Sequence, residues 1–90
     1  MSDLLELGRR GGSLAGRGVL DLHGHLGRHL FPIPATDARS VVAVLDRVGI
    51  EAIVVSHIQC EAFRFREGNA AVLRAMREHP GRILGYAIVF

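Results

Sequence analysis

The feature that most constrains the fold is a short apolar run near the middle of the chain, Ala52-Ile53-Val54-Val55. The run is rich in β-branched residues, contains no polar residue and is followed by Ser56 and His57. A strand with one solvated face alternates apolar and polar residues, so an unbroken run is typical of a strand buried on both faces, as in a parallel sheet. Because parallel strands require long crossover connections, usually helical, this run predicts an α/β fold.

An amphipathic helix is predicted before this strand. Thr36 and Asp37 are alternative N-caps, because short polar side chains at that position accept hydrogen bonds from free backbone N–H groups. Apolar residues then recur every three or four positions from Ala38 to Val48, which is one helical stripe. Gly49 suits the left-handed position just after a helix end.

A second helix is predicted after the strand. A loop of about ten residues, Ile58 to Glu67, leads into a helix over 68–79, for which Asn69 is a possible N-cap. Pro80-Gly81 ends that helix.

Two further strands complete the pattern, one over Val19–His25 and one over Ile83–Phe90. Strands and helices that alternate in this way form right-handed βαβ units with parallel strands. A (β/α)₈ TIM barrel takes roughly 250 residues, so 90 residues supply about three of its eight strands. We therefore expect a βαβαβ N-terminal portion of a (β/α)₈ TIM barrel, incomplete in this chain. Residues 1–18 are expected to form a flexible Gly/Arg-rich extension with one helical turn over Asp3–Leu7, and residues 19–90 the barrel portion.

Composition narrows the class of protein. Hydrophobic residues make up 49% of the chain and charged residues 22%, which is apolar for so short a chain and indicates burial against something that the 90 residues do not contain. The full-length protein could therefore be a homo-oligomer.

The single cysteine, Cys60, excludes a disulfide scaffold. The net charge of only +2 and the few aromatic residues argue against a nucleic-acid partner. No apolar run approaches the ~18 residues of a membrane span, and no export signal is visible, so a cytoplasmic location is expected.

The strongest chemical motif is Asp21-Leu22-His23-Gly24-His25, at the end of the first predicted strand. On a regular strand, residues two apart point to the same face about 6–7 Å apart, so His23 and His25 could bind one metal ion together. Zinc accepts neutral imidazole nitrogens, and a catalytic zinc site keeps one position for water. Asp21 is expected on the same face, where its carboxylate could orient a ligating histidine, while Leu20 and Leu22 are expected to pack on the helices. Five histidines in 90 residues also allow this spacing by chance, but its place at the carboxyl end of a strand favours a metal site.

Several segments in order resemble the amidohydrolase superfamily, in the branch that includes aminocarboxymuconate-semialdehyde decarboxylase. The resemblance covers about residues 19–90 and rests on Asp21–Gly27, Leu45–Ile50, Val54–Ser56, Gly68-Asn69 and His79–Ala87. It implies a (β/α)₈ barrel with a mononuclear or binuclear site for a divalent metal, with zinc the expected ion, in which His23 and His25 match the ligands from the first strand. The remaining ligands of the family, a later His and an Asp, would lie beyond Phe90. No catalytic residue is therefore assigned in this chain, which alone is not expected to be active.

Three further residues are candidates for binding a small-molecule substrate. His57 follows the second strand and could contact the substrate or a second metal, or could be a hydrogen-bonded structural histidine. Arg64 and Arg66 lie on the following loop and could hold a substrate carboxylate, or could simply be solvated.

Three functions follow from these observations. The first is a metal-dependent hydrolase in which an activated water attacks an amide, ester or lactone carbonyl. The second is a metal-dependent decarboxylase of a small unsaturated or aromatic acid on the same fold. The third, from a different class, is a non-catalytic βαβαβ module that binds a partner through its sheet edges.

Overall fold

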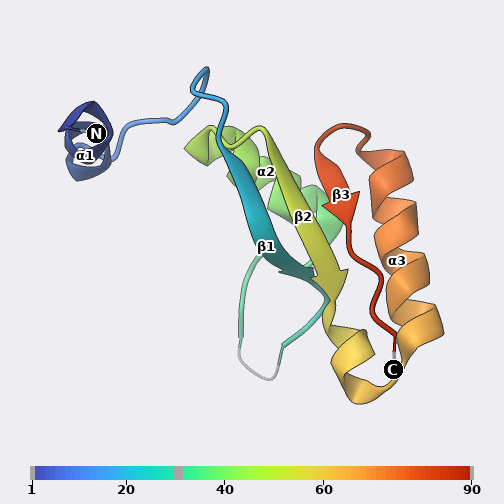
Figure 1. The fold of residues 1–90 in the computed structure, drawn as a ribbon. Helices are drawn as coiled ribbons and strands as arrows, with labels where there is room; N and C mark the ends of the chain where they lie inside the picture. Colours follow the sequence, from blue (N-terminus) through green and yellow to red (C-terminus); the bar gives the residue numbers. More distant parts are fainter. Residues whose placement is uncertain (1, 30–31, 90) are drawn as a thin grey trace.

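A three-stranded parallel sheet with helices on one face forms the body of the molecule (Figure 1). The computed structural model describes residues 2–29 and 32–89. The strands are β1 (Leu20–Leu26), β2 (Ala52–His57) and β3 (Ile83–Gly85), in the spatial order β1-β2-β3. Helix α2 (Ala38–Val48) connects β1 to β2, and the 3₁₀ helix η1 (Ile58–Ala62) and helix α3 (Phe65–Glu78) connect β2 to β3. The predicted α/β fold with parallel strands is confirmed.

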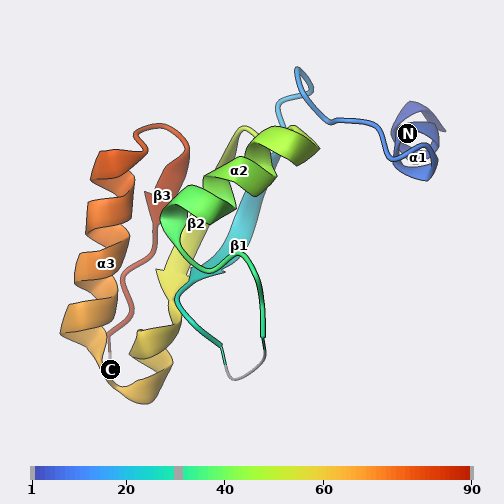
Figure 2. The same cartoon turned by 180° about the vertical axis from the view of Figure 1, so that it is seen from behind.

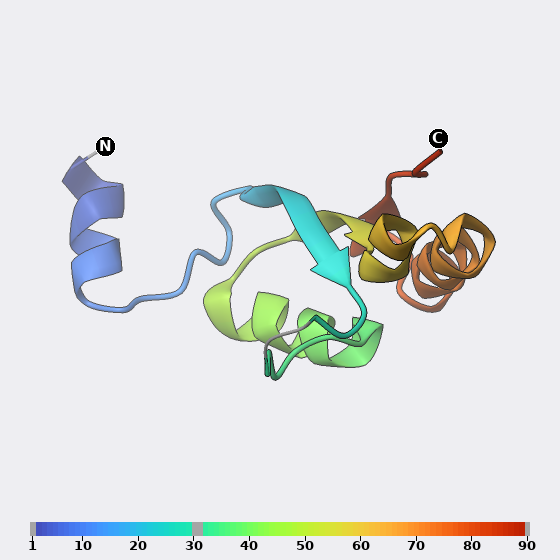
Figure 3. The same cartoon turned by 90° about the horizontal axis from the view of Figure 1, so that it is seen from below.

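Helices α2 and α3 pack on the same face of the sheet, and no helix in the described part of the chain covers the other face. Figure 2 shows α2 in front of β1 and β2 and α3 beside β3, and Figure 3 shows the sheet as one layer with α2 beneath it. The core lies between these layers and is made of Leu26, Val41, Leu45, Ile53, Val55, Val72, Ala75 and Ile83. We call the two sides of the sheet the helix face and the open face.

The ends of α2 are as the sequence predicts. Of the two alternative caps, Asp37 is the N-cap: its Oδ1 accepts a hydrogen bond from the Ser40 backbone N–H at 2.8 Å. Gly49 ends the helix in the left-handed conformation, with φ 91°, and its N–H donates to the carbonyl of Leu45 at 2.8 Å. Both signals act within one helical turn, which is why the sequence reveals them.

The start of α3 differs from the prediction. The expected ten-residue loop is largely helical, because η1 follows β2 directly and α3 begins at Phe65 rather than at Gly68. Phe63, in the left-handed conformation with φ 63°, separates the two helices. The N-cap residue is Arg64, which makes no side-chain capping bond, so the prediction of Asn69 as N-cap is wrong.

Asn69 instead holds the segment that follows β3. Its Nδ2 donates to the carbonyl of Ile88 at 2.9 Å, and its Oδ1 accepts from the N–H of Ile88 at 3.1 Å. The backbone of Ile88 is thus paired with a side chain of α3 and not with β2. This pairing explains why β3 ends at Gly85, whereas the sequence predicts a strand over Ile83–Phe90. Phe90 itself lies outside the described residues.

A β-bulge interrupts β1 in the middle of the histidine motif. Asp21 pairs with Ile53 and Gly24 pairs with Val55, so Leu22 and His23 together lie opposite the single residue Val54. A bulge adds one residue to one strand and shifts the alternation of side chains beyond it. The faces occupied by the motif residues therefore differ from those of a regular strand.

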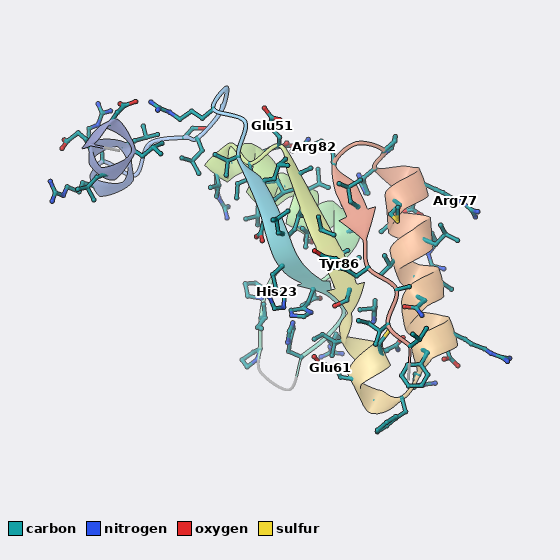
Figure 4. All side chains as sticks on the ribbon, in the orientation of Figure 1. His23, Glu51, Glu61, Arg77, Arg82 and Tyr86 are labelled. Carbon is teal, nitrogen blue, oxygen red and sulfur yellow. The ribbon has the colours of Figure 1, made fainter. Side chains whose placement is uncertain are left out.

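The opposite end of the sheet is held by Arg82. Its Nε donates to the carbonyl of Glu51 at 2.7 Å, and one of its terminal nitrogens forms an ion pair with Asp46 at 2.7 Å. Hydrogen bonds from a charged donor are among the stronger ones in proteins, so Arg82 fixes the turn between α2 and β2. Glu51 and Arg82 are both labelled at this end of the sheet in Figure 4.

The segment before β1 stands partly apart from the sheet. Helix α1 spans Ser2–Arg9, longer than the single turn expected, and is followed by a turn-rich stretch (Figure 1). The backbone N–H of Leu14 donates to the carbonyl of Val48 at 2.7 Å, which joins this stretch to the end of α2. Asp3 and Arg17 form an exposed ion pair at 2.5 Å.

None of the helices in the described part of the chain has the length and apolar character of a membrane span.

Candidate functional site

Two histidine rings lie side by side at the carboxyl end of β1. The ring centroids of His23 and His25 are 5.1 Å apart, with an angle of 67° between the ring planes. The side chains share the open face, because Gly24 between them lies on the helix face, where a Cβ would collide with the side chain of Ile53. The predicted juxtaposition of the two imidazoles is therefore present, and Figure 4 shows His23 beside β1.

Ser56 fixes one of the two rings. Nδ1 of His25 lies 3.2 Å from Oγ of Ser56, its partner in the register between β1 and β2. When Nδ1 carries the proton and donates to this hydroxyl, Nε2 carries the lone pair that a metal ion accepts. In the sequence Ser56 is only the residue that follows the apolar run, and the pairing of β1 with β2 brings it to His25.

Asp21 does not share the open face with His25. It pairs with Ile53, a core residue of the helix face, whereas His25 pairs with Ser56 on the opposite face. The bulge between the two pairs causes this difference, so the prediction of one common face is wrong for Asp21. Its carboxylate accepts a hydrogen bond from the backbone N–H of His23 at 3.0 Å. Asp21 therefore contacts the histidine motif through the backbone of the bulge.

Leu20 and Leu22 also differ from the prediction that they pack on the helices. Their side chains are 53% and 62% exposed. Leu20 lies on the open face, because it precedes the bulge and pairs with Ala52, one position from the core residue Ile53. The residue of β1 that packs into the helix-face core is Leu26, which is 4% exposed.

His29 is a neighbour that the sequence pattern did not assign to the site. Its ring centroid lies 6.0 Å from that of His25, so the loop after β1 folds back toward the pair. Within residues 2–29 and 32–89, however, no group of three or more His, Cys, Asp or Glu side chains is arranged to hold a metal ion. The donor set at the end of β1 is therefore the pair His23 and His25, with His29 nearby.

Tyr86 is a second neighbour that the sequence analysis missed. It follows β3, and its hydroxyl donates a hydrogen bond to the carbonyl of Leu22 at 3.2 Å. The side chain extends toward β1 (Figure 4). Since 64 positions separate the two residues in the sequence, no local pattern could have indicated this contact.

His57 occupies the opposite side of the sheet from the histidine pair. It is two positions from the core residue Val55 on β2, which places it on the helix face, and its ring packs against Gly27. Its Nδ1 accepts a hydrogen bond from the backbone N–H of Gln59 at 3.1 Å and so caps η1. Burial, and to a lesser extent the charge of Arg74, lowers the pKa of His57. These contacts support the structural interpretation of His57 rather than contact with a substrate on the open face.

Arg64 and Arg66 lie at the start of α3, and both are exposed. Arg64 is the residue before the helix, and Arg66 is in its first turn. Neither position buries the guanidinium group, so both groups remain available to an anionic ligand.

Comparisons of this chain with models of protein families, with curated proteins and with solved structures find no match.

Proposed function

We propose that this chain is the N-terminal portion of a (β/α)₈ barrel hydrolase of the amidohydrolase type, in which His23 and His25 bind a catalytic divalent metal, zinc. One observation carries the proposal: the two imidazoles lie 5.1 Å apart on the open face, at the carboxyl end of a parallel strand. Active sites of barrel enzymes lie at this end of the strands. In such a barrel the open face would be the interior.

The available donors suit zinc. Both are imidazoles, and when Nδ1 of His25 donates to the Ser56 hydroxyl, its Nε2 is free to bind a metal ion. Zinc in catalytic sites has three protein ligands and a water, so this pair would supply two of the three and later strands the rest. When bound, zinc would acidify a water and so supply a nucleophile near neutral pH.

The other residues of this chain would orient the pair and enclose it. Ser56 restricts rotation of the His25 ring, and the bulge fixes the backbone of His23. Leu20 and Tyr86 would contribute apolar surface to the barrel interior, which strengthens electrostatic interactions by excluding water. Arg64 and Arg66 would be available to a substrate carboxylate. His57 has no part in the reaction, because it lies on the helix face.

A second candidate, a non-catalytic binding module, is favoured by a different observation. Leu20, Leu84 and Tyr86 are 43–53% exposed on the same sheet. Apolar side chains exposed on a contiguous surface are typical of an interaction site. This function needs no metal, which separates it from the hydrolase.

The test is zinc binding measured by calorimetry on the 90-residue chain, with His23→Ala, His25→Ala and, as a matched control, His79→Ala at the end of α3. The hydrolase proposal predicts weak binding of one zinc, a loss of at least about tenfold in affinity for each site variant, and unchanged affinity for the control. Equal affinities for all four proteins would contradict it. In that case the binding module would be the better explanation.

A further inference from the structure

The bulge in β1 disturbs the regular pairing of Leu22 and His23 with β2. These two residues share one residue opposite them on β2, so the ladder of hydrogen bonds is disturbed at this point. Backbone polar groups that lose a ladder partner require another partner if they are not solvated. Two side chains supply such partners here, one from β1 itself and one from the segment after β3.

Asp21 and Tyr86 are these two side chains. The carboxylate of Asp21 accepts from the N–H of His23 at 3.0 Å, and the hydroxyl of Tyr86 donates to the carbonyl of Leu22 at 3.2 Å. The peptide group between Leu22 and His23 is therefore held at both its oxygen and its nitrogen. This peptide group carries the Cα of His23 and sets the direction in which its side chain leaves the strand.

The position of Tyr86 is itself fixed by the packing of β3. Gly85 faces α3 so closely that a Cβ there would collide with the side chain of Val72 and lie 2.9 Å from Sδ of Met76. The next residue, Tyr86, must then point to the open face, because side chains alternate along an extended segment. Its backbone N–H still donates to the carbonyl of Val55 at 2.8 Å, so the residue is anchored to the centre of the sheet.

From these contacts we infer that Tyr86 is a positioning residue for His23, acting through the backbone of the β1 bulge. The inference rests on the proposed function in one respect, since the purpose of the positioning is to hold His23 beside His25 for a shared metal. Tyr86 does not touch the imidazole pair in this arrangement. It reaches from the segment after β3 across β2 to β1, so the geometry of the site depends on how β3 packs against α3.

The test compares two variants that each remove one hydroxyl. Tyr86→Phe removes the bond to the Leu22 carbonyl, and Ser56→Ala removes the bond to the His25 ring. NMR spectra of the metal-free chain report the ring signals of the two histidines separately. We expect Tyr86→Phe to shift or broaden the signals of His23 more than those of His25, and Ser56→Ala to do the reverse.

Zinc affinity provides the second measurement. We expect Tyr86→Phe to weaken binding about threefold to tenfold. Asp21 holds the same peptide group at its N–H, and Asp21→Ala removes that contact, so the effects of Asp21→Ala and Tyr86→Phe on zinc affinity should be non-additive. Unchanged His23 signals in Tyr86→Phe, or equal changes at both histidines, would overturn the inference. If the wild-type chain binds no zinc, the proposed function fails, while the ring signals of the metal-free chain still decide the role of Tyr86.

Discussion

At the level of single residues, close contacts decide the face on which the histidine pair lies and the protonation of His57. Gly24 faces the side chain of Ile53 so closely that a larger residue would force Ile53 to shift, and the neighbouring His23 and His25 lie together on the other face. His57 shows how burial changes a titratable group. Its ring is partly buried against Gly27 and the charge of Arg74 acts on it, so its pKa is lowered and the neutral form is favoured.

The lowered pKa of His57 predicts a dependence of stability on pH. The unfolded chain has the ordinary histidine pKa of about 6.5, so between the lowered folded value and 6.5 the unfolded state binds more protons. This contribution to the free energy of unfolding is therefore fully present above pH 6.5 and is lost as the pH falls through the folded pKa. Urea unfolding between pH 8 and pH 5 measures it.

The matched variant is His57→Asn, whose side-chain oxygen can still cap η1 but does not titrate. We expect its free energy of unfolding to fall less between pH 7 and pH 5 than that of the wild type. His79→Asn should retain the full decrease, because it leaves His57 in place. An identical pH dependence in wild type and His57→Asn would show that His57 titrates alike in the folded and unfolded chain.

At the level of elements, Asn69 joins the segment after β3 to helix α3. The side chain of Asn69 provides the backbone of Ile88 with both a donor and an acceptor, as a neighbouring strand would. The segment after Gly85 therefore runs beside α3 instead of extending the sheet. Cys60, which is fully buried, lies 3.5 Å from the same Asn69 oxygen through its Sγ, so η1 meets the other two elements at this point.

Replacing Asn69 should release this segment. Asn69→Ala removes both bonds to Ile88 and should destabilise the chain by about 1–3 kcal/mol, the usual range for unsatisfied, partly buried polar groups. Asn69→Asp keeps an acceptor for the N–H of Ile88 but removes the donor to its carbonyl. We expect amide hydrogen exchange at Ile88 to be fastest in Asn69→Ala and intermediate in Asn69→Asp.

The amide of Tyr86 serves as the internal control, because it bonds to the carbonyl of Val55 on β2 and not to Asn69. Its exchange should change less than that of Ile88. Equal protection of Ile88 in all three proteins would mean that the segment is held by something other than Asn69.

At the level of the whole molecule, one face of the sheet is packed and the other is not. The helix face carries the core between the sheet and α2 and α3, while the open face exposes Leu20, Leu84 and Tyr86 by about half. Full burial of such a side chain contributes roughly 1.5–3 kcal/mol, which is large compared with the 5–15 kcal/mol stability of a typical domain. An uncovered face is therefore a strong driving force for association.

This predicts that residues 1–90 alone bind a hydrophobic dye or self-associate. Leu20→Thr with Leu22→Thr introduces β-branched residues, which favour a strand, while removing apolar surface, and should reduce dye fluorescence. Leu4→Thr with Leu5→Thr on α1 is the control, because those leucines are also exposed but lie outside the sheet. A monodisperse wild-type chain that binds no dye would contradict the prediction.

The features that the sequence determines by itself are those encoded within a few neighbouring residues. The apolar run of β2, the capping of α2 by Asp37 and the left-handed Gly49 are such features. Each depends on backbone groups of the same strand or helical turn, so the residue types alone indicate it. The proximity of His23 to His25 belongs to the same class, since only one residue separates them.

The tertiary structure decides on which face of the sheet the residues of β1 lie, and which distant residues contact the site. The bulge that separates Asp21 from His25 depends on pairing with β2, 31 or more positions away. The contact of Tyr86 with Leu22 spans 64 positions, and that of Asn69 with Ile88 spans 19. Such contacts join residues that only the folded chain brings together, and the gain from packing the core outweighs local preferences such as the capping tendency of Asn69. For that reason the strand alternation that the sequence predicts holds at the carboxyl end of β1 but not across the bulge.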